Sequence, residues 1–328
     1  MSTLRYTTEE LIREVRNRAV IPDTNAQGWT DEDIILYMNT EILTELVPQV
    51  AKLQEEFMVV TELLTLAVGD EFIPVPTRAV GNSLRDLIVV KGGNRGYIPR
   101  INREDLPSFQ SARGAASEIR GYYLEHSRIR LFPAVGSLGG ATGLEISYRF
   151  RPSQLTLADG ADSSYRVVTA VSTVANTITV SGGAPPPFGL NTSVDVHGAH
   201  SGAEMKVWDN EVTAVLANTL TLADPIDGTD TREGRRLVEL GDYVCTAETA
   251  AIPMLPRDVH QILAQSAVCA ITESIDDQEK LQMHTSRLNR MLKLMEYNLG
   301  KRVLGRPKKI LNRNAPLWQQ GNVQRRSL

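Results

Sequence analysis

Helical periodicity at both ends of the chain, with strand patterns between them, constrains the fold more than any other feature of the sequence. A capping-box spacing starts a predicted helix over residues 8–18, and a second helix begins after Thr30. Two further helical patterns follow Pro256, the second starting at a capping box formed by Asp276 and Glu279. Each predicted helix is apolar on one side only. Because such faces must be buried, we expect these helices to pack against one another as a bundle.

The middle of the chain has the alternating pattern and the turn signals that are typical of β-strands. Residues 57–76 predict two strands, residues 121–133 predict a hairpin that turns near His126, and residues 144–152 predict a further strand. Turn-forming residues dominate residues 91–117, which predict a long surface loop. A β-rich body therefore lies between the two helical ends.

An internal repeat marks a separate β unit within this middle part. VTAVSTVANTITV at residues 168–180 and VTAVLANTLTL at residues 212–222 each read as a strand, a turn with Asn-Thr and a strand. Between the copies, GGAPPPFG at residues 182–189 continues neither a strand nor a helix. We predict a small inserted all-β subdomain, followed by a strand at residues 237–245 that returns to the main body.

The predicted fold class is α+β, with a helical bundle from both chain ends, a β-rich body and an inserted all-β subdomain. The predicted parts are the N-terminal helices (1–56), the β-rich body (57–155), the inserted β subdomain (156–236), the return strand with the C-terminal helices (237–300) and a basic docking tail (301–328).

The chain ends in a strongly basic segment although its net charge is −4. From Thr285 onward there are eleven basic residues and one acidic residue, a net +10 that leaves −14 for the preceding part. A basic end on an acidic body indicates an electrostatic partner, and apolar side chains among the charges favour an arm that docks. We predict that these tail residues bind a partner: Lys301, Arg302, Arg306, Lys308, Lys309, Ile310, Leu311, Arg313, Leu317 and Trp318. A solvated, disordered terminus and a nucleic-acid-binding arm are the alternatives.

Few residues have a spacing that is typical of a metal site. His197 and His200, with Asp195 and Glu204 nearby, have side chains that suit zinc or a similar ion. They fall in a Gly-rich stretch, and a solvated loop is the favoured interpretation. The aspartates at residues 224–230 lack the spacing of an EF-hand loop, so a plain acidic turn is favoured there.

The sequence also lacks the common catalytic motifs. GGNRG at residues 92–96 has neither the spacing nor the Lys-Ser/Thr of a P-loop, and no Gly-x-Ser-x-Gly elbow occurs. His126 falls in a predicted turn and His260 at a helix start, where structural roles are favoured. We therefore predict no enzymatic activity, no cofactor and no metal.

Two features bear on where the chain is made. Cys245 and Cys269 have no partner spacing, which favours buried thiols and a reducing, intracellular place of synthesis. The chain has no apolar run long enough to cross a bilayer, and its N-terminal acids do not fit a signal peptide. We expect no membrane association.

The order and character of these segments resemble the head-to-tail adaptor (connector) proteins of tailed bacteriophages, especially short-tailed ones. The resemblance is carried by TTEELIREVRNRAVIP, GWTDEDIILYMNTEILTELVPQV, YYLEHSRIRLFP, LEISYRFRPSQLTL, GDYVCTAETAAIPMLPRDVHQILAQSAVCAI and RPKKILNRNAPLW. It implies a ring, usually a dodecamer, beneath the portal protein, with the genomic DNA passing through its lumen. It also implies that the C-terminal segment binds the portal and that the opposite face receives the tail nozzle or tube protein.

The sequence thus favours a structural virion protein of the phage neck and tail, made in the host cytoplasm and involved in DNA ejection. The acidic body suits a DNA channel, because like charge discourages the genome from binding as it passes. Two alternatives remain open. One is a nucleic-acid-binding protein that uses the basic tail, and the other is a virion-associated glycan-binding protein or hydrolase that uses the inserted subdomain.

Overall fold

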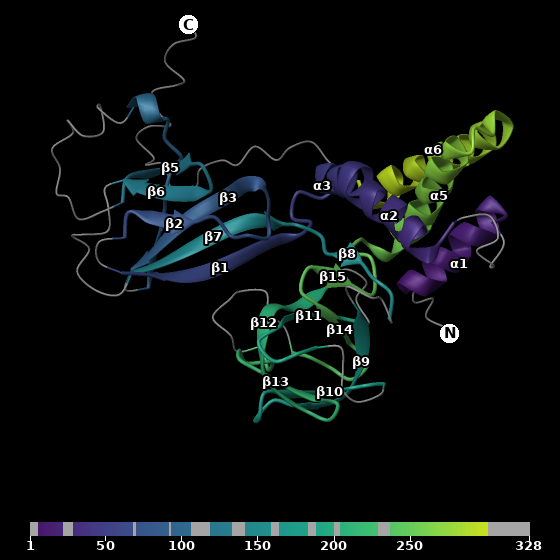
Figure 1. The fold of residues 1–328 in the computed structure, drawn as a ribbon. Helices are drawn as coiled ribbons and strands as arrows, with labels where there is room; N and C mark the ends of the chain where they lie inside the picture. Colours follow the sequence, from purple (N-terminus) through teal and green to yellow (C-terminus); the bar gives the residue numbers. More distant parts are fainter. Residues whose placement is uncertain are drawn as a thin grey trace, which may run out of the picture.

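The computed structural model describes residues 6–21, 29–67, 70–91, 93–105, 119–132, 142–158, 164–182, 188–199, 204–228 and 237–300. It contains helices and strands in an α+β arrangement, as predicted, with a helical layer, a β-rich body and a closed barrel (Figure 1). Each of these three units has a hydrophobic core of its own.

The helical layer combines segments from distant parts of the sequence. Its elements are α1 (Thr8–Ala19), α2 (Asp31–Glu41), the π-helical segment η2 (Ile42–Leu46), α3 (Val47–Leu53), α5 (Arg257–Ser274) and α6 (Gln278–Leu299). Helix α5 contacts α1, α2 and α6 and is the most deeply buried of them. None of the described helices is both long and apolar enough to cross a membrane.

Local capping determines where these helices start. Both predicted N-terminal starts are confirmed, because Thr7 and Thr30 each accept a hydrogen bond from the backbone of the third helical residue. The predicted start of α6 is wrong by one residue. Asp277, not Asp276, is the N-cap and accepts from the backbone N–H of Lys280, since Asp276 adopts a left-handed conformation in the preceding turn.

Pro48 follows a widened turn rather than lying within a continuous α-helix. Helix α2 instead widens into η2, where the backbone N–H of Val47 donates to the carbonyl of Ile42, five residues earlier. Helix α3 then resumes with Pro48 in its first turn, where a missing N–H costs little. The extra residue of the π-turn thus accommodates the proline.

The β body has two antiparallel sheets that share one core. The first sheet has the order β1 (Val59–Leu66), β7 (Thr142–Phe150), β3 (Ala79–Lys91) and β4 (Asn94–Tyr97). The second has the order β2 (Phe72–Pro74), β6 (Arg128–Phe132) and β5 (Gly121–Glu125). The hairpin at His126 is confirmed, with that residue in the left-handed region.

Two sequence expectations for the body are wrong. Residues 91–117 are not one loop, because Asn94–Tyr97 forms a strand that pairs with the end of β3 and a 3₁₀ turn, η3 (Arg103–Asp105), follows. The prediction also omitted β3 itself. This strand pairs with β7, which follows it by more than fifty residues, so its partner is invisible to local patterns.

The third unit is a closed barrel of six strands. Around the barrel the strands are β10 (Thr177–Val180), β13 (Thr219–Leu222), β12 (Met205–Leu216), β11 (Ser193–His197), β14 (Tyr243–Thr246) and β9 (Tyr165–Ser172). Both predicted repeat hairpins are present, as β9 with β10 and β12 with β13, and they pair with each other through β10 and β13. Closure leaves no unpaired edge.

The expectation for residues 237–245 needs correction, because strand β14 does not return to the main body. It pairs with β11 on one side and β9 on the other, which closes the barrel. The chain leaves the barrel afterwards, through a short parallel pair formed by β8 (Gln154–Leu155) and β15 (Thr249–Ala250). This pair lies between the barrel and the helical layer (Figure 1).

Candidate functional site

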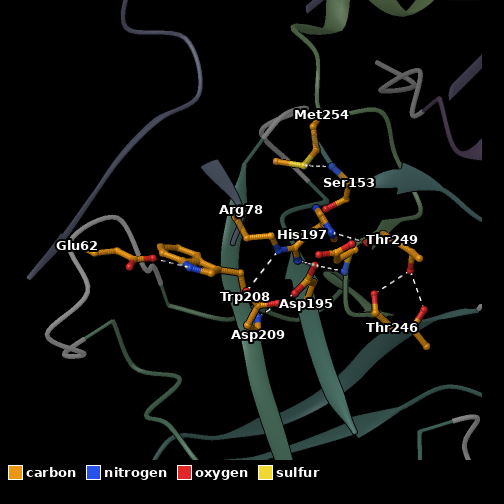
Figure 2. A network of polar contacts seen from close by, with 11 residues as sticks. Glu62, Arg78, Ser153, Asp195, His197, Trp208, Asp209, Thr246, Thr249 and Met254 are labelled. Carbon is orange, nitrogen blue, oxygen red and sulfur yellow. Dashed lines mark hydrogen bonds and ion pairs between the residues drawn. The ribbon is translucent and has the colours of Figure 1, made fainter. Parts of the chain in front are cut away.

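Polar side chains buried between the β body and the barrel form the most distinctive site of the described structure (Figure 2). Arg78, directly before β3, is only 2% exposed. Its guanidinium forms an ion pair with Asp195 on β11, and its Nε lies 3.3 Å from a carboxylate oxygen of Asp209 on β12. The same group lies over the ring of Phe150 at 5.3 Å. One arginine of the body thus enters the barrel and binds two of its strands.

Asp195 is fully buried, and three donors compensate its charge. Besides Arg78, the backbone N–H groups of Asp209 and Glu248 each donate to it at 2.9 Å. Burial raises the pKa of Asp195 to about 6, and the nearby guanidinium limits the rise. The carboxylate is therefore ionised at neutral pH, where its ion pair with Arg78 links the β body to the barrel.

An aromatic side chain crosses the same boundary in the other direction. Trp208 extends from β12 into the core of the β body and packs edge-on against Phe150, with ring centroids 5.9 Å apart. Its indole N–H donates to Glu62 on β1 over 3.3 Å, and the Tyr148 hydroxyl donates to the same carboxylate oxygen over 2.7 Å. The two units are therefore locked by reciprocal insertions.

A second set of contacts ties the helical layer to the barrel and to its connecting strands. Glu9 of α1 accepts a 2.6 Å hydrogen bond from the Tyr165 hydroxyl and a 3.0 Å bond from the backbone N–H of Ala158. Asn39 of α2 makes two hydrogen bonds with the backbone of Leu155, of 2.7 and 3.4 Å. All three units are thus joined by specific polar contacts as well as by the chain.

An apolar cleft of about 650 Å³ opens where the three units meet. Its lining combines the end of α3, the start of β1 and the end of α6, together with Trp208, Phe150 and Met254. The carboxylates among the lining residues are Glu55, Glu56 and Glu204. No nucleophile and base converge there within the described part of the chain.

The predicted metal candidates are only partly assembled. His197 is buried in β11 rather than solvated in a loop, and its Nε2 lies 2.9 Å from the carbonyl oxygen of Thr249. Burial lowers the pKa of His197 to about 4, so the ring is neutral and donates to that carbonyl. His200 lies outside the described residues. Among the residues that the structure describes, no three His, Cys, Asp or Glu side chains are placed to hold a metal ion.

The aspartates of residues 224–230 are likewise placed in part. Asp224 exchanges two hydrogen bonds with the side chain of Asn210, through its backbone carbonyl and N–H, of 3.1 and 2.9 Å. These bonds close a turn after β13, in keeping with the acidic-turn interpretation. Asp230 lies outside the described residues.

The remaining candidates occupy structural positions. His260 is buried in α5 with Nε2 3.0 Å from the carbonyl oxygen of Leu255, and burial lowers its pKa to about 4. Cys245 is completely buried in β14 and Cys269 partly so in α5, and burial raises the pKa of both thiols. Each therefore acts as a small apolar side chain, as predicted for the pair.

The predicted docking residues of the tail, from Lys301 to Trp318, all lie outside the described residues. The described chain ends at Gly300, directly after Leu299, which lines the apolar cleft. Sequence reasoning missed Arg78 and Trp208. Neither residue carries a local signal, because the partner of Arg78 is 117 positions away in the sequence and that of Trp208 is 146 positions away.

Comparison with known protein families identifies a match. The sequence pattern of a family described as SU10 adaptor protein matches residues 6–178, which is more than half of the chain. The matched region covers α1 to α3, the whole β body and most of the first hairpin of the barrel, ending within β10. No curated protein matches the chain. The match supports the resemblance to phage adaptor proteins that the order of segments indicates, and the chain belongs to the SU10 adaptor protein family.

Proposed function

We propose that this protein is a non-enzymatic structural component of a phage virion that joins the portal to the tail. The observation that carries the proposal is the family match over residues 6–178, since the matched family is one of adaptors. The proposed place is the neck of the virion, after synthesis in the host cytoplasm. The resemblance favours a virion of the short-tailed type.

The geometry of the junction supports a mechanical role. The buried ion pair of Arg78 with Asp195 and the insertion of Trp208 link body and barrel, and Glu9 links the helices to the barrel. A part that transmits force between a head and a tail needs units that keep their relative orientation. Buried polar contacts with few alternative partners provide such orientation.

We further propose that the protein acts as a ring, of dodecameric size, in which the helices pack as one bundle at the portal side. Cyclic assembly needs head-to-tail contacts between different faces of neighbouring copies. The lumen passes the genomic DNA, and the net charge of −14 before residue 285 discourages the DNA from binding to the wall. The opposite face receives the tail nozzle or tube protein.

The basic tail is the proposed portal-binding element. Residues 301–328 contain eight Lys or Arg residues and no acid, with Ile310, Leu311, Leu317 and Trp318 as apolar anchors. Charge steers such an arm to its partner, and the anchors slow its release. In a ring all arms bind together, so modest individual contacts give a persistent joint through effective concentration.

Deletion of residues 301–328 tests this role. We expect the truncated protein to stay folded, since the deletion begins beyond α6, but to lose co-sedimentation with portal particles by about tenfold or more. A variant with Leu317→Ser and Trp318→Ser is expected to lose most of the binding as well. Arg325→Gln with Arg326→Gln, outside the anchor region, is the matched control and is expected to bind normally. Undiminished binding of the truncated protein to portal particles would contradict the proposed role of the tail.

The same tail makes DNA binding the second candidate function, because eight basic residues without an acid suit phosphate contacts. The two functions differ in salt dependence. Binding of the full-length protein to duplex DNA with a steep logarithmic salt slope, lost on deletion of residues 301–328, would favour the DNA function. Portal binding that depends on Leu317 and Trp318 favours the adaptor function.

A further inference from the structure

Helix α6 has a second face that the subunit does not bury. Five side chains recur along it at intervals of four, three, four and three residues, which is the spacing of a coiled-coil seam: Met283, Arg287, Arg290, Leu294 and Tyr297. Met283, Leu294 and Tyr297 are 61%, 62% and 67% exposed. His284 and Met295, which face the core, lie on a different side of the helix. We call these five side chains the α6 stripe.

Within the described part of the subunit, the charges of the α6 stripe have no acidic counterpart. No ion pair joins Arg287 or Arg290 to an acid among the described residues. Large apolar side chains that are exposed at such regular spacing indicate a surface that contacts a partner. Long arginine side chains can cover apolar surface while keeping their charge for an acid of that partner.

The segment formed by α2 and η2 carries the complementary surface. Between Asp31 and Leu46 there are five acids and no Lys or Arg. Glu32, Leu36, Thr40 and Leu43 recur at helical spacing on its exposed side, with Leu36 65% and Leu43 42% exposed, and Glu45 is exposed nearby. We call Glu32, Leu36, Thr40, Leu43 and Glu45 the α2 face.

The threonine hydroxyls along the α2 face and a serine hydroxyl beside the α6 stripe form hydrogen bonds within their own helices. The hydroxyl of Thr40 donates to the carbonyl of Leu36 over 2.9 Å, and that of Thr44 to the carbonyl of Thr40 over 2.9 Å. Beside the α6 stripe, the hydroxyl of Ser286 donates to the carbonyl of Gln282 over 2.8 Å. Covering these three residues would therefore bury methyl and methylene groups without leaving their hydroxyl donors unpaired.

The two surfaces also match in length. The α6 stripe extends over about 21 Å and the α2 face, from Glu32 to Leu43, over about 17 Å, from the helical rise per residue. Both α2 and α6 pack on α5 with their buried sides, so both outer sides remain available for another molecule (Figure 1).

We propose that the α6 stripe of one copy packs against the α2 face of the next copy and forms the lateral contact of the ring. This inference rests on the proposed ring and names the surfaces that build it. The apolar side chains supply the buried area, and the positive charge of Arg287 and Arg290 faces the acidic α2 segment, on which Glu32 and Glu45 are exposed. Because the two surfaces differ, the contact is head-to-tail and propagates from copy to copy until the ring closes.

Charge reversal on the two surfaces tests the contact with full-length protein and portal particles. One variant carries Arg287→Glu with Arg290→Glu, and a second carries Glu32→Arg with Glu45→Arg. A third combines all four changes in one chain. Arg13→Glu with Arg128→Glu reverses two exposed charges outside the two surfaces, one in α1 and one in β6, and is the matched control. The readouts are the number of copies that co-sediment per portal particle and covalent cross-linking between copies.

Each surface variant alone should lose ring assembly by about tenfold or more, because like charges then face each other. An equal mixture of the two variants should regain it, since copies alternate and each contact again joins opposite charges. The chain with all four changes should regain it too, which shows that every variant folds. The matched control should assemble like the wild type.

Three results would contradict parts of this account, and they differ from one another. Wild-type assembly by either surface variant alone would overturn the lateral contact and leave the ring intact. Loss without recovery in the mixture and in the four-change chain would also overturn it, and would indicate that these surfaces bind the portal instead. A wild-type protein that forms no ring on portal particles would overturn the proposed function itself.

Discussion

At the scale of single residues, Arg78 is the side chain on which the joint between body and barrel depends most. Replacement by Met would leave the Asp195 carboxylate buried without its cation, which costs roughly 3–5 kcal/mol of the free energy of unfolding. Adding Asp195→Asn should recover part of that loss, because the uncompensated charge disappears. Chemical denaturation of the single and double variants measures the coupling.

An exposed ion pair offers the control for that cycle. Arg85 pairs with Glu56 at the surface of the body, and Arg85→Met should cost under about 1 kcal/mol. Equal losses of unfolding free energy in the two arginine variants would show that burial does not strengthen the contribution of the Arg78 ion pair to stability.

Stability should also depend on pH through the buried imidazoles. The pKa of His260 is lowered to about 4 in the folded protein, so only the unfolded chain takes up its proton between about pH 6.5 and 4. The stabilisation is therefore complete above about pH 6.5 and is lost as the pH falls. From about pH 7.5 to 5 the loss should be roughly 2 kcal/mol for this group.

The variant His260→Gln tests the assignment, because Gln can keep a donor near the Leu255 carbonyl but does not titrate. Its unfolding free energy, followed by helix circular dichroism, should fall less than that of the wild type over the same pH range. His197 acts in the same direction, whereas Asp195, with a pKa raised to about 6, acts in the opposite direction. An identical pH profile for variant and wild type would contradict the role of His260.

At the scale of elements, the two repeat hairpins of the barrel offer a matched comparison. Asn176 and Ala217 both adopt a left-handed conformation in their turns, with φ near 50°. Asn tolerates this conformation and Ala does not, so Ala217→Gly should stabilise the barrel by about 0.5–1 kcal/mol. Asn176→Gly should change stability by much less. Thermal unfolding of the two variants checks the difference, and a gain from both or from neither would contradict it.

The same scale shows what sequence could and could not predict. The starts of α1 and α2 were predictable because a threonine and an acid three residues later fix them locally. The two repeat hairpins were predictable because their pairing is also local. Strand β14 was misplaced because it pairs with β11 and β9, which lie some fifty and eighty residues earlier.

The candidate site was less predictable than the elements that carry it. Arg78 and Asp195 are an ordinary arginine and aspartate until the body and the barrel meet, and only then do burial and charge give them a role. His197 drew attention through its neighbour His200, yet its ring donates to the Thr249 carbonyl. The histidine at this position thus suggested a metal site, whereas its buried environment gives it a structural role.

At the scale of the whole molecule, acidic and basic residues are separated along the chain. Buried contacts hold the helical layer, the β body and the barrel together, and the basic residues 301–328 follow the last helix. We interpret these three units as the rigid wall of the proposed channel and the tail as the segment that attaches it to the portal. The central claim is that copies of this protein join a portal as one closed ring.

Electron microscopy of portal particles mixed with the full-length protein tests that claim most directly. The account predicts a closed ring of copies on one end of each portal particle, coaxial with its channel. Portal particles that stay bare at saturating protein, or that carry isolated copies without a ring, would contradict it.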